Sequence, residues 1–402
     1  MQMFSCKVKE LASRAENKLS AQFAIFDDIA MANTERVLNA FHTHRVSDSH
    51  FAGSTGYGLG DAGRDTFDRV VADVFGKESA IARIQFSSGT HTISAALFGV
   101  LRPGDVLVSA AGAPYDTLQG VIRRLSEYGI VYRELPLLPD GCPDMGGLAD
   151  IVRDAKAVLV QRSRGYSARP ALHIEIVSEI VDIIRNVNKN VITLIDNCYC
   201  EFVDICEPDG DLIMGSFIKN PGGGLAPTGG YIAGKSDLVE AAALSLTAVG
   251  TENGASLGVN RLMLQGLFLA PHVVAQALKT AAFAAAMLEE LDYSVDPLPF
   301  DRRTDIVQSI RFDNPAGLLK FCRGIQKGSP IDSFAAPEPS EMPGYDCNVV
   351  MAAGTFIQGG SLELSCDAPM REPYTAFLQG GLTYEAGKFG VMTAIEQLIM
   401  DN

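Results

Sequence analysis

The sequence lacks an uninterrupted apolar run of about 18 residues, so no helix that crosses a bilayer is expected. Its first residues, MQMFSCKVKELASRAENKLS, also lack the continuous apolar stretch of a secretory signal, and we expect no signal peptide. Positive charge is scarce: 33 Lys and Arg against 48 Asp and Glu give a net charge of −15. Because an acidic chain is not attracted non-specifically to nucleic acid or to an anionic membrane surface, neither is an expected partner.

Cysteine is present but follows no pattern. The 8 cysteines are scattered without the spacing of a disulfide scaffold, so we expect reduced thiols and a cytoplasmic protein. His42, His44 and His50 lie close together, but no acidic or cysteine residues complete a metal-binding set, and we expect no metal. What remains is an ordinary globular composition, with 47% apolar and 20% charged residues. A length of 402 residues suggests two or three domains.

Short apolar strands alternate with helical patterns between residues 79 and 235. Such alternation predicts an α/β fold whose mostly parallel sheet is covered by helices on both faces. We expect residues 1–50 to form an N-terminal helical arm, residues 51–270 a large domain around this sheet, and residues 271–402 a smaller C-terminal α+β domain. A long helical pattern over residues 255–292 is expected to carry the chain out of the large domain.

Two local boundaries precede the candidate site. The Gly-rich stretch GSTGYGLGDAGRD predicts a loop, which a helix from about Thr66 to Phe75 follows. The next apolar run, AIARIQF, predicts a buried strand, and we expect the helix after it over ISAALFGVL. The residues SSGTHT therefore lie between the end of a strand and the start of a helix.

Two polar residues follow apolar strands, where an open parallel sheet binds its ligands. Asp196 ends VITLID and Lys219 follows LIMGSFI. A carboxylate in such a place needs a partner, such as the protonated ring nitrogen of a cofactor, although an Asp that caps the next turn fits equally well. A partly desolvated Lys loses its charge more easily and becomes a nucleophile for a Schiff base, although a lone Lys at a turn is commonly a surface residue. The PGGG that follows Lys219 favours the first interpretation, because glycines let the backbone approach a ligand.

An anion site and an aromatic face are predicted nearby. The segment from Ser87 to Thr90 opens a helix, where free N–H groups favour a phosphate, with an ordinary helix cap as the alternative. Tyr115 lies between these landmarks and is the candidate to stack on a planar ring, unless it is simply a core or surface residue. An amine, an acid, an anion site and a stacking face together meet the needs of pyridoxal phosphate.

Six motifs resemble the large aspartate-aminotransferase-like family of pyridoxal-phosphate enzymes. The resemblance is closer to its methionine gamma-lyase-like or aluminium-resistance branch, relatives of cystathionine beta- and gamma-lyases. The motifs are GYGLGDAGRDTFD, QFSSGTHTI, QRSRGYSARP, IDNCYCEF, GSFIKNPGGGLAPTGGYIAG and REPYTAFLQGGLTYE. They extend over nearly the whole chain, and the Lys-PGGG and QRSRGY segments are quite specific to this branch. The resemblance implies the fold-type I architecture of pyridoxal-phosphate-dependent transferases.

The resemblance also implies roles for individual residues. Lys219 would hold the cofactor and then move protons on the substrate, while Asp196 would keep the pyridine nitrogen protonated. Tyr57 would reach the phosphate of a neighbouring subunit and assist protonation of the leaving group. Ring stacking would fall to Tyr115, and phosphate binding to Ser88, Gly89, Thr90 and Ser216.

The chain departs from the pattern at three places, one of which is Ile218, just before the Lys, where some relatives place a hydroxyl. Better-known relatives carry an Arg two residues after the Tyr, where this chain has Leu59, and Arg64 is the candidate substitute. The usual C-terminal Arg for the substrate carboxylate is not in its familiar setting. We expect Arg371 in this role, with Arg162 and Arg164 as further candidates, and each of the three is equally compatible with a salt-bridged surface arginine.

The activity that the resemblance implies is a carbon–sulfur lyase. Its substrate would be cystathionine, methionine or a cysteine conjugate, split by α,β- or α,γ-elimination into an oxo acid, ammonia and a thiol. The alternatives are an aminotransferase or other pyridoxal-phosphate enzyme on the same scaffold, and a non-catalytic stress-linked binding protein. The resemblance further implies a homodimer or homotetramer whose active sites are shared between subunits.

Overall fold

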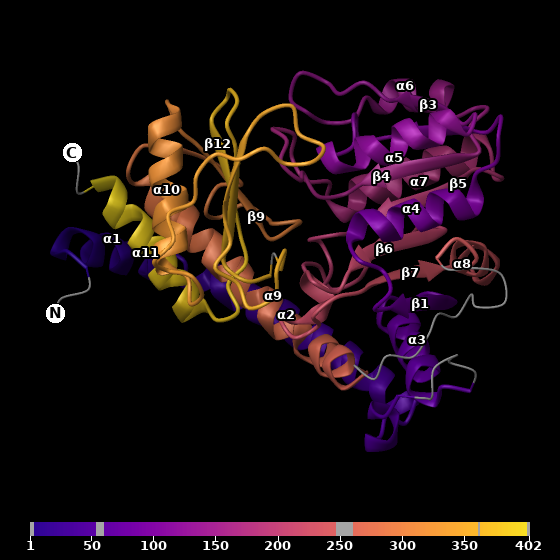
Figure 1. Cartoon of the computed structure of the whole chain (residues 1–402), viewed down its shortest axis with the longest axis horizontal. Coiled ribbons are helices and arrows are strands. Elements are labelled where there is room, and N and C mark those ends of the chain that lie inside the picture. Colours follow the sequence, from indigo (N-terminus) through magenta and orange to yellow (C-terminus); the bar gives the residue numbers. More distant parts are fainter. Residues whose placement is uncertain (1–3, 54–59, 247–259, 361, 400–402) are drawn as a thin grey trace.

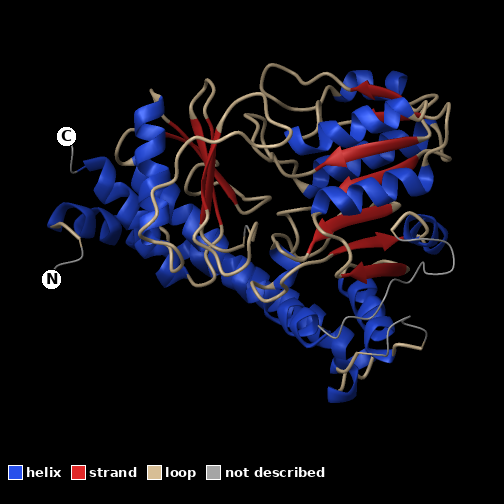
Figure 2. Cartoon of the chain, viewed as in Figure 1, coloured by secondary structure: helices blue, strands red, loops and turns tan. Residues whose placement is uncertain are grey.

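The computed structural model describes residues 4–53, 60–246, 260–360 and 362–399. Within these ranges the chain forms two separate β-sheets, each with its own helices, and long helices run beneath both (Figures 1 and 2). The predicted α/β fold, a mostly parallel sheet covered by helices beside a smaller α+β unit, is confirmed.

The larger sheet has the strand order β1-β7-β6-β5-β4-β2-β3. Only β7 runs against its neighbours, so the other six strands are parallel, and in Figure 2 their arrowheads point toward the second sheet. The strands are β1 (Ser79–Arg83), β2 (Val106–Ser109), β3 (Val131–Glu134), β4 (Ala157–Gln161), β5 (Ile192–Asp196), β6 (Leu212–Ser216) and β7 (Gly230–Gly234).

Both faces of this sheet are covered because its central strands are apolar throughout. All five residues of β4, AVLVQ, are buried. Val158 and Val160 join the hydrophobic cluster on one face, and Ala157 and Leu159 join the cluster on the other. The first cluster includes α3 (Ala62–Val74), α6 (Met145–Ile151) and α7 (Ile174–Val187), and the second includes α4 (Gly89–Val100), α5 (Asp116–Glu127) and α8 (Ser236–Ala243).

The second sheet is antiparallel, in the order β10-β11-β12-β9-β8. Helices α10 (Pro315–Gly328) and α11 (Tyr384–Ile399) pack together beside it. Side chains alternate along β11: Cys366 faces α10, where its Sγ lies 3.9 Å from that of Cys322, so Asp367 points to the opposite face. The strands are β8 (Ser294–Asp296), β9 (Val307–Arg311), β10 (Val349–Ala352), β11 (Ser365–Pro369) and β12 (Thr375–Gln379).

Long helices connect the two units. The N-terminal residues form α1 (Cys6–Lys18), α2 (Ser20–Thr43) and the short 3-10 helix η1 (Asp48–Phe51). Helix α9 (Asn260–Glu289) packs against α2 and α11 and passes through the boundary expected at residue 270 without a break. The division into domains stays a prediction.

By length and composition α9 is the one helix in the described part of the chain that would suffice to cross a membrane. The sequence had predicted no helix that crosses a bilayer, and length and composition alone do not show that α9 crosses one. Of its apolar window, 72% is buried inside the fold, as in a core helix. Its apolar residues are accounted for by packing between the two units.

Two predicted helix boundaries were too late in the chain. Helix α3 begins at Ala62 rather than Thr66, because the Asp61 side chain accepts a hydrogen bond from the Arg64 N–H and caps it. Helix α4 begins at Gly89 rather than Ile93, because the Ser88 hydroxyl accepts from the His91 N–H. The Asp61 cap lies in the Gly-rich stretch that had predicted a loop, whereas a cap within Ser87–Thr90 had been one of the two alternatives predicted for that segment.

Candidate active site

A cavity of about 230 Å³ lies between the carboxyl ends of the parallel strands and the second sheet. The second sheet contributes Val349, Met351 and Asp367, and the loop before β10 contributes Met342 and Tyr345. The cavity therefore depends on both units. Of the residues predicted for the site, those that line it are Ser88, Gly89, Thr90, Tyr115, Asp196 and Lys219.

Lys219 follows β6 and precedes the short 3-10 helix η2 (Asn220–Gly222). Its ammonium nitrogen lies 3.6 Å from the ring centroid of Tyr199. Burial alone would lower the pKa of Lys219, but acidic neighbours, Tyr199 and Asp196 among them, raise the pKa above its usual value. This direction is opposite to the one predicted from desolvation. Lys219 is the only cation among the described residues that line the cavity.

The turn after Lys219 rests directly on helix α9. A Cβ at Gly223, whose φ is +55°, would lie 2.2 Å from the carbonyl oxygen of Gly266. A Cβ at Gly266 would lie 2.2 Å from the carbonyl oxygen of Gly222. Two glycines therefore allow a backbone-to-backbone contact that no larger residue permits.

Asp196 ends β5 and is 4% exposed. Its Oδ1 accepts a hydrogen bond of 3.1 Å from the backbone N–H of Cys198. Burial raises the pKa of Asp196, and the charge of Lys219 opposes that rise. A buried carboxylate beside an amine, at the end of a parallel strand, is suited to bind a protonated heterocyclic nitrogen.

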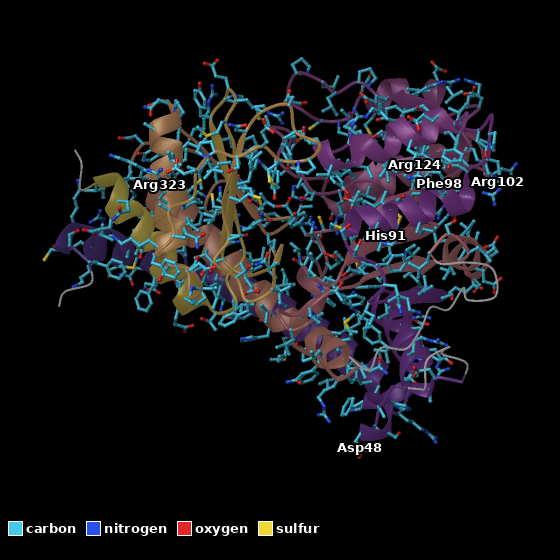
Figure 3. The ribbon with its side chains drawn as sticks, viewed as in Figure 1. Asp48, His91, Phe98, Arg102, Arg124 and Arg323 are labelled. Atoms are coloured by element: carbon cyan, nitrogen blue, oxygen red, sulfur yellow. The ribbon has the colours of Figure 1, made fainter. Side chains whose placement is uncertain are left out.

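The start of α4 is compatible with both predicted roles, an ordinary helix cap and a phosphate site. Ser88 is an ordinary N-cap, and the same helix end lines the cavity, where the first backbone N–H groups of a helix lack intrahelical partners. In Figure 3, His91 marks the end of α4 nearer the second sheet, whereas Arg102 lies beyond the other end. A Cβ at Gly89 would lie 2.8 Å from the Cys198 sulfur, so a larger residue at this turn would require the Cys198 side chain to move.

Tyr115 precedes α5 and joins this group of residues. Its hydroxyl lies 2.9 Å from the Thr90 hydroxyl, and its backbone N–H donates to the Gln161 side chain at 3.0 Å. Burial raises the pKa of Tyr115 well above its usual value, so the phenol stays protonated. An aromatic ring fixed at both ends can serve as a stacking face.

Other predicted residues lie outside the cavity. Ser216 is buried and donates its hydroxyl hydrogen bond to the Gly229 carbonyl at 3.2 Å, which does not favour a role in phosphate binding. Arg64 forms an ion pair with Asp65 at 2.8 Å. Tyr57 and Leu59 lie outside the described residues, so their roles stay predictions.

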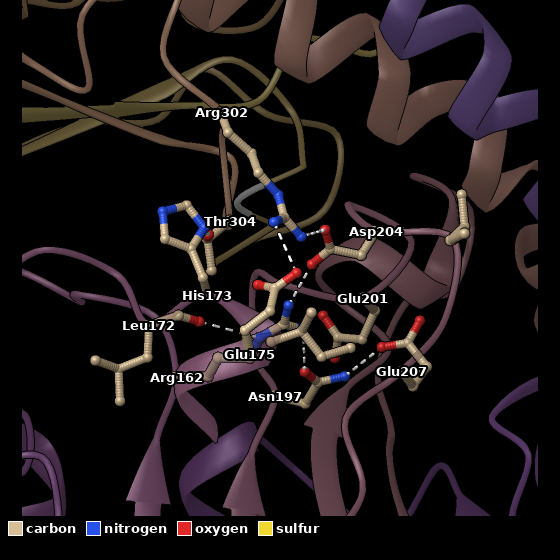
Figure 4. A network of polar contacts seen from close by, with 12 residues as sticks. Arg162, Leu172, His173, Glu175, Asn197, Glu201, Asp204, Glu207, Arg302 and Thr304 are labelled. Atoms are coloured by element: carbon tan, nitrogen blue, oxygen red, sulfur yellow. Dashed lines mark hydrogen bonds and ion pairs between the residues drawn. The ribbon is translucent and has the colours of Figure 1, made fainter. Parts of the chain in front are cut away.

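None of the three candidate arginines lines the cavity. Arg162 is fully buried and binds Asp204 at 2.5 Å and Asn197 at 3.0 Å (Figure 4). Arg164 is buried in an ion pair with Asp296 at 2.5 Å. These positions favour structural ion pairs over a role in substrate binding. Arg371, at the surface, pairs with Asp346 at 2.7 Å and with Asp116 at 3.4 Å.

Sequence reasoning missed Tyr199, Tyr166 and Asp367, all of which line the cavity. Tyr199 has a φ of +71°, a left-handed conformation that no residue pattern indicates for a tyrosine. Tyr166 belongs to the motif QRSRGY, of which only the two arginines had been predicted to bind the substrate. Asp367 is a carboxylate within a buried strand, the same signal that had singled out Asp196.

Metal binding has little support in the described part of the chain. No group of three or more His, Cys, Asp or Glu residues gathers there in a geometry that would hold an ion. Of the three clustered histidines, His44 forms an ion pair with Asp73 at 2.7 Å.

Comparisons with known proteins agree with one another. The model of the methionine gamma-lyase family matches residues 8–399. The Bacillus subtilis (strain 168) protein YnbB, which is uncharacterized, is 45% identical over 406 residues, or 98% of this chain and 96% of YnbB. A Clostridium acetobutylicum protein, provisionally assigned as a cystathionine beta-lyase involved in aluminum resistance, is 46% identical with a TM-score of 0.95, over 99% of this chain and 96% of its own. The carbon-sulfur lyase involved in aluminum resistance from Clostridium novyi NT is 46% identical with a TM-score of 0.94, over 99% and 97% of the two chains.

A more distant likeness concerns the fold alone. The pyridoxal-5'-phosphate dependent protein YhfS from Escherichia coli is 18% identical, with a TM-score of 0.63 over 91% of this chain and 96% of its own. The arrangement of the two sheets is thus shared with pyridoxal-phosphate proteins of very different sequence.

Proposed function

This chain belongs to the methionine gamma-lyase family, and from that premise we propose that it is a pyridoxal-phosphate-dependent carbon–sulfur lyase. Its substrate is an amino acid that contains sulfur, such as cystathionine, methionine or a cysteine conjugate. The names of two close relatives, a cystathionine beta-lyase and a carbon-sulfur lyase, support this proposal. The observation that carries it is one cavity that holds an amine, a carboxylate, a helix N-terminus and an aromatic ring.

The residues of the cavity fit the cofactor part by part. Lys219 would hold its aldehyde, Asp196 its ring nitrogen, and the N–H groups at the start of α4 its phosphate. Tyr115 would pack on its ring. Ser88, Gly89 and Thr90, at the start of α4, all line the cavity.

When bound, pyridoxal phosphate supplies an electron-withdrawing ring that stabilises negative charge at the α-carbon of an amino acid. Lys219 would move the α-proton, and Asp196 would keep the ring nitrogen protonated. The phenol of Tyr199, against the Lys219 amine, would orient that amine. Overall, one C–S bond is broken and one water is consumed, and the products are a thiol, ammonia and a 2-oxo acid.

We further propose a cytoplasmic homodimer or homotetramer in which Tyr57 acts in the site of a neighbouring subunit. Exposed apolar side chains on the long helices support association, among them Met31 of α2, which is 72% exposed. Arg371 stays the proposed partner of the substrate carboxylate, because its side chain is 38% exposed and free to change partners, unlike the two buried arginines.

The test uses the purified protein with pyridoxal phosphate. We expect a visible absorbance band from bound cofactor and the release of thiol and ammonia from cystathionine or a cysteine conjugate in equal amounts. If no band forms on adding the cofactor, the proposal fails. Transfer of the amino group to an added oxo acid without thiol release would instead identify an aminotransferase.

A further inference from the structure

Asp367 is a carboxylate in the wall of the cavity to which the proposed chemistry assigns no role. It lies in the middle of β11, directly opposite Met351 of β10, and both side chains line the cavity. Only 6% of Asp367 is exposed. Ionised carboxylates are seldom buried to this extent without a cation or hydrogen-bond donors.

Its hydrogen bonds satisfy one carboxylate oxygen and leave the other open. The Tyr166 hydroxyl and the Gln379 amide, the latter at 3.0 Å, both donate to Oδ2 of Asp367. Within the described structure, Oδ1 of Asp367 and Oε1 of Gln379 have no hydrogen-bond partner. Of these two residues only Asp367 lines the cavity, and its open oxygen fits a group that has several donors and no acceptor, such as an ammonium.

The charges that line the cavity point the same way. Asp196, Asp367 and Lys219 are the charged residues among the described residues that line it. In the proposed function, Lys219 and Asp196 are both engaged by the cofactor, which leaves Asp367 without a counter-charge. Burial raises the pKa of Asp367 to about 6, so the carboxylate is still mainly ionised near neutral pH.

The path to Asp367 is apolar. Ile218, Met342, Val349 and Met351 line the cavity beside it. Methionine side chains adapt to flexible chains of methylene and sulfur atoms. A thioether arm would therefore lie against apolar wall and end at a carboxylate.

We propose that Asp367 is a specificity-determining residue that selects sulfur-containing amino acids whose S-substituent ends in an ammonium group. This inference rests on the proposed function and narrows its substrate class. Tyr166 and Gln379 position the carboxylate by donating to its second oxygen.

The experiment compares two substrates of equal size. S-(2-aminoethyl)cysteine and S-propylcysteine differ only in an ammonium that replaces a terminal methyl group. For the wild-type holoenzyme we expect kcat/KM for the ammonium substrate to be at least about tenfold higher. In Asp367→Asn we expect that preference to vanish, with the value for S-propylcysteine within about threefold of wild type. Substrate-induced changes in cofactor absorbance give the dissociation constants, which should follow the same pattern.

Asp313→Asn is the matched control, because Asp313 is an exposed carboxylate just before α10, and the variant should leave kcat/KM for both substrates unchanged.

If Asp367→Asn does not fold, the pH profile of the wild type decides: the preference for the ammonium substrate should grow as the pH rises through about 6. The titratable groups that face Asp367 are Tyr166, Tyr345 and Lys219, and burial or neighbours raise the pKa of each. Turnover of neither substrate, together with no turnover of cystathionine or methionine, would refute the proposed function. Turnover of both at equal kcat/KM in the wild type, or an equal loss for both in the variant, would refute the inference alone.

Discussion

Two buried polar groups in this molecule differ in how completely they are paired. Arg162, fully buried, is bound by Asp204, Asn197 and the Leu172 carbonyl, and Arg302 adds a second cation to Asp204 (Figure 4). In the cavity, by contrast, Asp367 is equally inaccessible but keeps an unpaired oxygen. The first cluster is complete without a ligand, and the second is not.

Whether every polar atom of a buried charged residue has a partner distinguishes structural residues from functional ones more clearly than the residue type does. Both clusters contain residues from motifs that suggested substrate binding. A closed network leaves no donor or acceptor for a ligand, and breaking it exposes buried charge. An open one lowers stability on its own and is retained where a ligand completes it. The predictions below test this contrast from both sides.

The largest effect should come from Lys219→Ala. Because this residue would both hold the cofactor and move the proton, we expect thiol release to fall at least about 10⁴-fold, with loss of the visible cofactor band. Absorbance spectra and a thiol assay measure the two effects. Lys235→Ala is the control, since Lys235 is exposed and paired with Asp211. Unchanged turnover in Lys219→Ala would contradict the proposal that the reaction depends on pyridoxal phosphate bound to Lys219.

Arg162→Met should destabilise the fold by about 3–5 kcal/mol, because it removes the buried cation that pairs with one oxygen of Asp204 and donates to the side-chain oxygen of Asn197. Urea unfolding measures the change. Arg302→Met touches the same Asp204 from a side chain that is 51% exposed, and we expect less than about 1 kcal/mol there. Equal losses in the two variants would contradict the distinction between buried and exposed partners.

Asp367→Asn should reveal what the open cluster costs. The pKa of Asp367 is raised from 3.8 to about 6 by burial, so its contribution to stability is fully present below pH 4 and is lost as the pH rises through about 6. The neutral amide avoids this loss. In urea unfolding without cofactor, the variant should gain about 2–3 kcal/mol relative to wild type between pH 4 and pH 8. A difference that does not change with pH would show that the carboxylate is not desolvated.

The smallest effect on stability is expected for Arg371→Ala. Its ion pairs with Asp346 and Asp116 are partly exposed, so the free energy of unfolding should change by less than about 1 kcal/mol. If Arg371 binds the substrate carboxylate, KM should rise about tenfold or more, a loss typical of a charged hydrogen bond. Arg371→Lys should restore part of it. An unaltered KM would exclude Arg371 as the partner of the substrate carboxylate.

The fold was predictable from the sequence because its signals are local. Apolar runs such as VITLID and LIMGSF mark buried strands, and their alternation with helices fixes a parallel sheet. The errors at α3 and α4 arose where a cap, Asp61 or Ser88, stands in a stretch rich in small residues. The helical pattern over residues 255–292 also predicted the long helix α9 that leaves the larger unit, and the boundary expected at residue 270 falls inside that helix.

The site was only partly predictable. Asp196, Lys219 and Tyr115 follow strands, and strand ends converge in a parallel sheet, so spacing alone brought them together. Asp367 comes from the second sheet, whose position relative to the first has no signature in the sequence. The predicted roles of Arg162 and Arg164 were not supported, because a sequence motif shows which residues are present but not which partners they contact. Tertiary packing pairs these two arginines with Asp204 and Asp296.

The contact of Gly222 and Gly223 with Gly266 has one more consequence. The turn after Lys219 touches the backbone of α9 directly, with no side chain between them, and α9 also packs against the second sheet. Alanine at position 266 would therefore displace the amine and the opposite wall of the cavity together, without altering any residue that meets the substrate. Selection on catalysis thus extends to a helix position with no side chain at all.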